Sequence, residues 1–192
     1  MTLKDYTTLS LAEVRAELEA IARDTETSFG SLDIRQLNWR PEATRWSVAQ
    51  CFEHLLAANR LMLQAASDAM DGTRSRTVWE RIPVLPGLWG RMLIRSQAPN
   101  GARKFKTSAI AQPAASDLPA DIVARFVAQQ DEAVRRIDAQ DEGQAARVIM
   151  TSPFIRVVTY SVLDGWRLMV SHDRRHLEQA RRVTESPEFP KA

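Results

Sequence analysis

Residues 47–70 read SVAQCFEHLLAANRLMLQAASDAM, and this stretch decides the fold class. Ser47 and Gln50 stand three positions apart at its start, which is the spacing of a capping box that begins a helix. Apolar side chains then recur every three or four positions, the period of one helix face: Val48, Cys51, Phe52, Leu55, Leu56 and Met62. The sequence therefore predicts a long amphipathic helix from Val48 to about Met70.

Three further helices are predicted on either side of that segment. Ser10 and Glu13 form another capping box, and the helix that they begin is expected to end near Gly30. A third helix fits residues 119–140, with Asp121 in its first turn, and a fourth fits residues 159–183. Residues 37–41 are expected to be extended, because a proline at position 41 disfavours helix at the residue before it.

The composition favours helix throughout the chain. Only 7 of the 192 residues are glycine, while the helix formers Ala, Leu, Arg, Glu and Gln are plentiful. Alternation of apolar and polar residues, which is typical of a strand, is confined to short segments such as residues 155–159. We therefore expect an all-α fold, a four-helix bundle in which residues 1–192 form a single domain.

The second and third predicted helices are separated by residues 71–118. This connection is much longer than the loops of an up-down bundle, so it predicts a crossover that lets the two flanking helices run parallel. Residues 78–96 contain many large apolar side chains and should pack against the bundle. Residues 97–115 contain Pro, Gly and small residues, which indicates a loop.

Charge and cysteine content exclude several classes of protein. Lys and Arg number 26 against 24 Asp and Glu, so the whole chain is not a polyanion binder by bulk charge. The single cysteine excludes an intrachain disulfide, and the start MTLKDYTTLS lacks the pattern of a signal peptide. No apolar stretch approaches the ~20 residues that span a bilayer. We expect a cytoplasmic protein without a membrane span.

The three histidines of the chain are its strongest functional signal. His172 and His176 stand four positions apart and so share one helix face, a spacing at which two imidazoles can bind one divalent metal ion. His54 lies on the predicted helix 48–70, on a face without charged residues. Hydrogen-bonded core histidines are the alternative interpretation. No catalytic triad, glycine-rich phosphate loop or Cys-x-x-Cys pair accompanies them.

Five residues near the histidines need an assignment. Gln50 and Gln179 could hydrogen-bond the ligands or a substrate, or serve as caps and core hydrogen-bond partners. Cys51 could supply a fourth ligand, although a small buried apolar role is commoner for a free cysteine. Glu53 and Asp173 are rotated by about 100° from the neighbouring histidine, so we expect them to point away from the metal in salt bridges or at the surface.

Three segments resemble the DinB/YfiT-like family. Residues 46–55, WSVAQCFEHL, resemble the motif on the second helix of that family, and residues 171–180, SHDRRHLEQA, resemble the histidine pair on its last helix. Residues 37–41, LNWRP, resemble the approach to the metal helix. The resemblance implies a four-helix bundle with a divalent metal held by three histidines, which in this chain are His54, His172 and His176.

This resemblance also suggests a function. Some relatives transfer a low-molecular-weight thiol to an electrophile, and others resemble metal-dependent hydrolases. The resemblance favours thiol transfer, with bacillithiol, mycothiol or glutathione as candidate thiols. A non-catalytic metal-binding stress-response module is the alternative from another class. Three imidazoles suit Zn or Ni best and also accept Fe or Mn. The expected assembly is a homodimer that acts on a small molecule.

A basic segment covers residues 72–106. Its basic side chains are Arg74, Arg76, Arg81, Arg91, Arg95, Arg103, Lys104 and Lys106, and its only acid is Glu80. Trp79 and Trp89 lie among them. A solvated lid, a surface for an anionic cosubstrate and a membrane-surface patch all fit this composition. Nucleic-acid binding is disfavoured, because no known DNA-binding or RNA-binding motif accompanies the charge.

Overall fold

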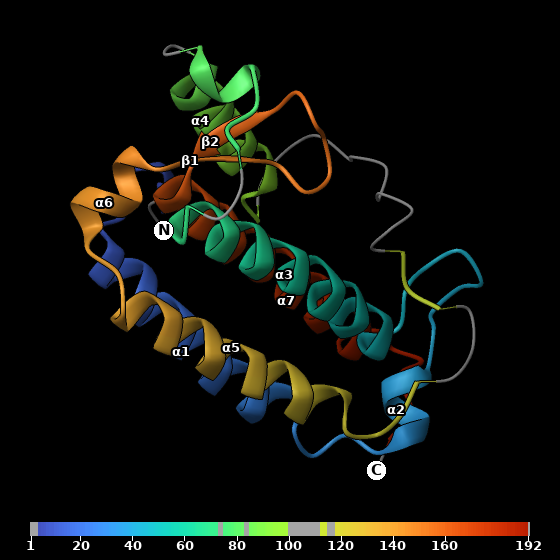
Figure 1. Cartoon of the computed structure of the whole chain (residues 1–192). Coiled ribbons are helices and arrows are strands. Elements are labelled where there is room, and N and C mark those ends of the chain that lie inside the picture. The colour runs from blue at the N-terminus through green and yellow to red at the C-terminus, as the bar shows by residue number, and fades with distance from the viewer. Residues whose placement is uncertain (1–3, 73–74, 83–84, 100–111, 115–117, 192) are drawn as a thin grey trace.

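The computed structural model describes residues 4–72, 75–82, 85–99, 112–114 and 118–191, and these are mostly helical. Four long helices dominate: α1 (Leu11–Phe29), α3 (Val48–Met70), α5 (Ile122–Asp138) and α7 (Val162–Thr184) (Figure 1). The predicted capping boxes at Ser10 and Ser47 are both present, and the backbone N–H of Gly30 caps the end of α1. Local sequence signals therefore placed both ends of α1 and of α3 correctly.

Contacts between the long helices define their directions. The carbonyls of Leu56 and Leu63 accept hydrogen bonds from Gln129 and Arg136, so α3 and α5 run parallel, as the long connection predicts. Helix α1 begins where α5 ends, since Arg15 pairs with Asp138, and α1 and α5 are therefore antiparallel. Helices α1 and α3 each pack against both α5 and α7.

Two of the predicted helices begin later than expected. Helix α5 begins at Ile122, and Asp121 occupies the N-cap position rather than the first turn. Helix α7 begins at Val162 because the three residues before it form a strand, β2 (Thr159–Ser161). This strand pairs antiparallel with β1 (Ile149–Thr151), with Met150 opposite Tyr160. A small two-stranded sheet thus corrects the all-α expectation.

Short elements complete the described chain. Asp33 and Gln36 form a capping box for α2 (Ile34–Asn38), so the expectation that residues 37–41 are all extended is wrong at Leu37 and Asn38. Helix α6 (Glu142–Arg147) joins α5 to β1, and two 3₁₀ helices, η1 (Tyr6–Thr8) and η2 (Trp79–Arg81), lie near the β1–β2 end. Among the described residues, no helix is long and apolar enough to cross a membrane.

The connection between α3 and α5 contains a further helix, α4 (Leu85–Gln97). It packs against α7 and β2, which agrees with the prediction that residues 78–96 contact the rest of the protein (Figure 1). Most of the predicted loop 97–115 and the basic residues Arg74, Arg103, Lys104 and Lys106 lie outside the described residues.

The core lies between the four long helices. Phe52 of α3 makes edge contacts with Phe29 of α1 and with Phe126 of α5, and all three rings are almost completely buried. These ring contacts fix α3 against its neighbours two residues before His54. The scaffold can therefore hold a side chain on α3 at a fixed distance from side chains on α7.

Candidate metal centre

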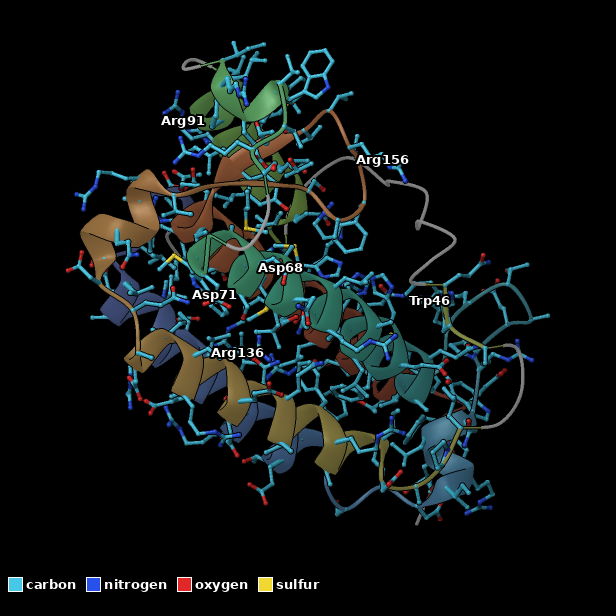
Figure 2. The ribbon with its side chains drawn as sticks, viewed as in Figure 1. Trp46, Asp68, Asp71, Arg91, Arg136 and Arg156 are labelled. Atoms are coloured by element: carbon cyan, nitrogen blue, oxygen red, sulfur yellow. The ribbon has the colours of Figure 1, made fainter. Side chains whose placement is uncertain are left out.

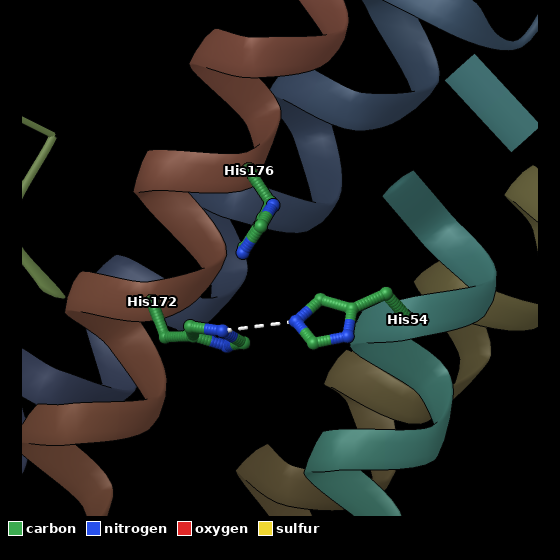
Figure 3. A group of neighbouring side chains, drawn as sticks. All are labelled: His54, His172 and His176. Carbon is green, nitrogen blue, oxygen red and sulfur yellow. Dashed lines mark hydrogen bonds between the residues drawn. The ribbon is translucent and has the colours of Figure 1, made fainter. Parts of the chain in front are cut away.

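The three histidines meet between α3 and α7. His54 comes from α3, and His172 and His176 come from successive turns of α7, whose direction is opposite (Figure 3). Their ring centroids are 4.6–5.0 Å apart, and one ligand nitrogen from each ring lies within 4.8 Å of the others. The structure thus brings together the three residues that the sequence singled out, and we call them the histidine cluster.

The geometry of the histidine cluster fits a shared metal ion. Nε2 of His54 and Nε2 of His172 lie 3.2 Å apart. Two nitrogens bound to one zinc ion at about 2.0–2.1 Å would stand about 3.3 Å apart at a tetrahedral angle. Nδ1 of His176 is buried and has no hydrogen-bond partner among the described residues. Three converging lone-pair donors of one chemical kind are the donor set that zinc and nickel accept.

Electrostatics keep the cluster in the form that binds metals. Withdrawal from water, together with the neighbouring His54 and Arg175, lowers the pKa of His176 to about 3, against a hydrogen bond with Gln179 that raises it. The pKa of His172 also lies well below its usual value, because of burial and of the charges of His176, His54 and Arg175. Both rings are therefore neutral at pH 7, and metal binding needs no proton to leave an imidazolium.

Trp46 covers one side of the histidine cluster. Its ring stacks on His176, with centroids 5.8 Å apart and planes at 22°, and it also contacts His54 at 5.1 Å. It directly precedes Ser47, the N-cap of α3, so the cap that begins the helix also positions the indole. The sequence motif contained Trp46, but its spacing alone indicated no role for the ring.

Gln50 and Glu53 hold the crossover chain against α3. Gln50 accepts a hydrogen bond from the backbone N–H of Ser47 and donates one to the carbonyl of Ala114. The carboxylate of Glu53 accepts a hydrogen bond from the N–H of Ala114 at 2.6 Å. The structure thus gives Gln50 the capping role of the two that the sequence left open, and Glu53 binds backbone rather than a salt-bridge partner.

Two residues on α7 lie beside the histidine cluster. Gln179 hydrogen-bonds with His176, and this bond raises the pKa of the His176 ring against the larger effect of burial. Arg175 donates to the carbonyl of Ser96 at the end of α4 at 2.9 Å, while its charge acts on His172 and His176. Sequence reasoning missed Arg175, although its place between the two histidines was a signal that it borders the same face.

Cys51 lies in the core. It is completely buried, and burial raises the pKa of its thiol to about 12. The group of side chains that could hold a metal contains the three histidines, and Cys51 is not in it. The structure thus favours the apolar role for this cysteine and a cluster of three ligands.

Asp173 corrects the expectation of a surface or salt-bridge role. Its side chain is completely buried and accepts hydrogen bonds from Asn59 at 3.0 and 3.1 Å and from Gln130 at 3.1 Å. Burial raises the pKa of Asp173 to about 7, against the effect of these hydrogen bonds and of Arg174. We call Asp173, Asn59 and Gln130 the Asp173 cluster; it joins α7 to α3 and α5 and is separate from the metal-binding group.

Comparison with known proteins supports the resemblance seen in residues 46–55 and 171–180. A family model described as DinB superfamily matches residues 17–180, a range that includes all three histidines. No curated protein and no solved structure matched the chain. Because the family model covers most of the sequence, the chain belongs to the DinB superfamily.

Proposed function

We propose that this chain is a divalent-metal-dependent enzyme whose centre consists of His54, His172 and His176. One observation supports the proposal above the others: one ring nitrogen from each of the three histidines lies within 4.8 Å of the other two, which is the arrangement of a group that can hold a metal ion. Zn or Ni is the preferred ion, and Fe or Mn is compatible with the same ligands. Three protein ligands leave a coordination position open, which is typical of catalytic rather than structural sites.

The reaction that we propose is transfer of a low-molecular-weight thiol to a small electrophilic molecule. A bound divalent ion supplies Lewis acidity that favours the deprotonated form of a thiol. In the transfer, the sulfur forms a bond to an electrophilic carbon, the leaving group departs with its bonding electrons, and the thiol proton passes to solvent. Hydrolysis, in which the same ion would activate water, is the alternative reaction.

The side chains around the cluster have matching roles in this proposal. Trp46 keeps water from one side of His54 and His176, and Gln179 orients the ring of His176. Arg175 places a cation beside the ligands and can pair with a carboxylate of the thiol or of the electrophile. These groups bind and orient; none of them has to move a proton.

The test begins with the metal content of the purified, untagged protein. We expect about one divalent ion per chain in the wild type and almost none in His172→Ala/His176→Ala. The control is Glu178→Ala/Arg182→Ala, which changes two solvent-facing residues with the same i, i+4 spacing on the same helix. Absence of metal from the wild type after incubation with Zn or Ni would exclude the proposed centre.

A substrate screen then separates the functions that share this centre. The metal-loaded protein is incubated with thiols and electrophiles, and with esters and amides, beside the double histidine variant. Thiol adducts that form only with the wild type support transfer, and hydrolysis products support the alternative. Full metal occupancy without turnover of any substrate would favour a non-catalytic metal-binding stress-response module instead.

The proposal also covers the architecture, location and assembly of the chain. We propose that the four long helices form a four-helix bundle, that residues 1–192 are one domain with residues 71–118 as its crossover, and that the protein is a cytoplasmic homodimer. A single cooperative unfolding transition tests the domain assignment. Light scattering of the purified protein tests the homodimer.

A further inference from the structure

Helix α4 exposes an unusual stripe of side chains. Its buried residues, which face α7 and β2, are Pro86, Gly90 and Ile94. The exposed residues on its outer side are Leu88, Arg91, Met92 and Arg95. These four are spaced i, i+3, i+4 and i+7, so they form one continuous stripe along the helix. A solvent-facing stripe is normally mixed and polar, whereas this one contains only apolar and basic side chains.

Two neighbouring segments extend the same surface. Val78, just before η2, is 73% exposed, and Trp79, the first residue of η2, is 43% exposed. Ile82, just after η2, is also exposed. The turn between β1 and β2 presents Ile155 and Val157 on either side of Arg156, all exposed. Among the described residues, seven of the eight exposed large apolar side chains therefore lie on three short segments, and the eighth is on α2.

Contacts between these segments hold them together at one end of the molecule. Helix α4 packs against β2, and η2 packs against both strands (Figure 1). The hydroxyls of Thr77 and Thr151 lie 3.3 Å apart, and Thr151 also donates to Glu80 at 2.5 Å. We call the exposed side chains of residues 76–82, 88–95 and 155–157 the apolar–basic end.

The charge of the apolar–basic end has one sign. Its exposed arginines are Arg76, Arg81, Arg91, Arg95 and Arg156. Within residues 75–82, 85–99 and 149–161, as far as the structure describes them, the only acid is Glu80. It is buried, and its carboxylate accepts hydrogen bonds from Thr77 and Thr151. In the view of Figure 2, Arg91 and Arg156 lie on opposite flanks of this end.

This combination selects among the surfaces that could cover it. A second copy meeting the chain through this end would bring five arginines against five arginines. The exposed Asp5, which lines a pocket with Arg95 at the edge of the patch, could pair with few of them. A nucleic acid would satisfy the arginines but would leave the exposed aliphatic side chains without a partner. An anionic lipid surface satisfies both, because its phosphates pair with arginine while aliphatic and Trp side chains enter the boundary between headgroups and acyl chains.

We propose that the apolar–basic end binds the surface of membranes that contain anionic lipids. The chain would lie on the membrane without crossing it, with α4, η2 and the β1–β2 turn in contact with the lipid. The proposal does not depend on the metal centre, so the two can fail independently.

The experiment is co-sedimentation of the full chain with lipid vesicles at low salt. We expect binding to vesicles of phosphatidylcholine mixed with phosphatidylglycerol and none to phosphatidylcholine alone. Arg91→Gln/Arg95→Gln should weaken the partition coefficient by about 25-fold, since each arginine near an anionic surface contributes about five-fold. The control Arg125→Gln/Arg135→Gln removes two exposed arginines from α5 and should bind as the wild type does.

A second matched pair tests the apolar contribution. Leu88 of α4 and Ile34 of α2 are equally exposed, at 55% and 54%, so neither Leu88→Ser nor Ile34→Ser should affect folding. Leu88→Ser should weaken vesicle binding by roughly five-fold, and Ile34→Ser should leave it unchanged. Equal binding to both kinds of vesicle, no binding to either, or binding that both α4 variants leave intact would overturn the proposal. So would binding to duplex nucleic acid alone.

Discussion

The histidine cluster and the Asp173 cluster are neighbours with opposite chemistry. Both join α3 to α7, and they begin at adjacent residues, His172 and Asp173. In the Asp173 cluster, two amide groups donate hydrogen bonds to a carboxyl group, so donors and acceptor complete one another. In the histidine cluster, nitrogens of three rings converge, with one short contact between His54 and His172.

This difference separates a structural polar cluster from a ligand site. A buried carboxyl group that receives its hydrogen bonds from the protein is stable without a further partner. Three imidazoles with converging ring nitrogens offer lone pairs that can bind one cation. Asn59 and Gln130 do keep buried amide oxygens without partners in the described structure, so the match in the Asp173 cluster is complete only at its carboxyl group.

The largest effect that distinguishes the clusters should come from added metal. Zn or Ni should stabilise the wild type by roughly 4 kcal/mol when the free ion is in about 1000-fold excess over its Kd. His172→Ala/His176→Ala should lose this stabilisation, because the ion would have only one imidazole left. Thermal unfolding with and without metal measures it.

Asp173→Asn is the matched control for that experiment, since it changes the adjacent residue of the same helix. It should retain the metal-induced rise in Tm. If the rise in Tm disappears in Asp173→Asn and persists in the histidine variant, the metal binds at the Asp173 cluster and the histidine cluster is not the metal site.

The second effect is on stability without metal. Asp173→Ala should lower the free energy of unfolding by about 2–3 kcal/mol, because the buried amides of Asn59 and Gln130 lose their acceptor. Asp173→Asn should cost less, since its amide oxygen can still accept one hydrogen bond. His172→Ala should lower the free energy of unfolding less than Asp173→Ala does, because no buried amide loses its acceptor. Urea denaturation of the chelated proteins measures all three, and equal losses in Asp173→Ala and His172→Ala would contradict the comparison.

Sequence alone predicted the parts of this architecture that depend on local signals. The capping boxes at Ser10 and Ser47 predicted where α1 and α3 begin, because a cap is formed by residues three positions apart. The β1–β2 pair was missed because its hydrogen bonds join Ile149 to Ser161 across a turn, and neither strand is long enough to show a pattern. The short α2 had a readable capping box, Asp33 with Gln36, that was overlooked.

The sequence predicted the positions of some residues of the site better than those of others. Helical spacing alone places His172 and His176 together. The uncharged helix face of His54 made it a candidate partner, and the family resemblance joined it to the pair, because spacing says nothing about which helices meet. Asp173 was expected in a salt bridge or at the surface because its position on the helix is rotated by about 100° from His172. That rotation points it away from the histidines, but into a second buried contact rather than into solvent. The amides of Asn59 and Gln130 within otherwise apolar helix faces were the signal of its buried partners.

The third effect is a pH dependence of opposite sign in the two clusters, measured with metal chelated. The pKa of Asp173 is raised from 3.8 to about 7, so the folded state holds a proton that the unfolded chain releases. The contribution of Asp173 to stability is therefore fully present at low pH and is lost as the pH rises through about 7. The pKa of His176 is lowered from 6.5 to about 3, so its contribution is lost as the pH falls below 6.5.

Paired variants isolate these two contributions. Between pH 7 and pH 5, the stability of the wild type relative to Asp173→Asn should increase as the solution is acidified. Over the same range, the stability of the wild type relative to His176→Gln should decrease. Urea midpoints at a series of pH values give both differences, and slopes of the same sign would refute the assignment of one neutral acid and one neutral base.

The smallest expected effect is that of Cys51→Ser on metal content, which should be none. The thiol lies one turn before His54 on α3, but it is buried in the core and outside the metal-binding group, and its pKa of about 12 keeps it protonated. A metal ligand must be the thiolate, so the protein environment opposes ligation by Cys51. A buried serine hydroxyl should cost about 1–3 kcal/mol of stability, and metal analysis should still find one ion per chain. Substantial loss of the ion would instead make Cys51 a fourth ligand, and a closed centre of four ligands would have no position at which a thiol or water could bind.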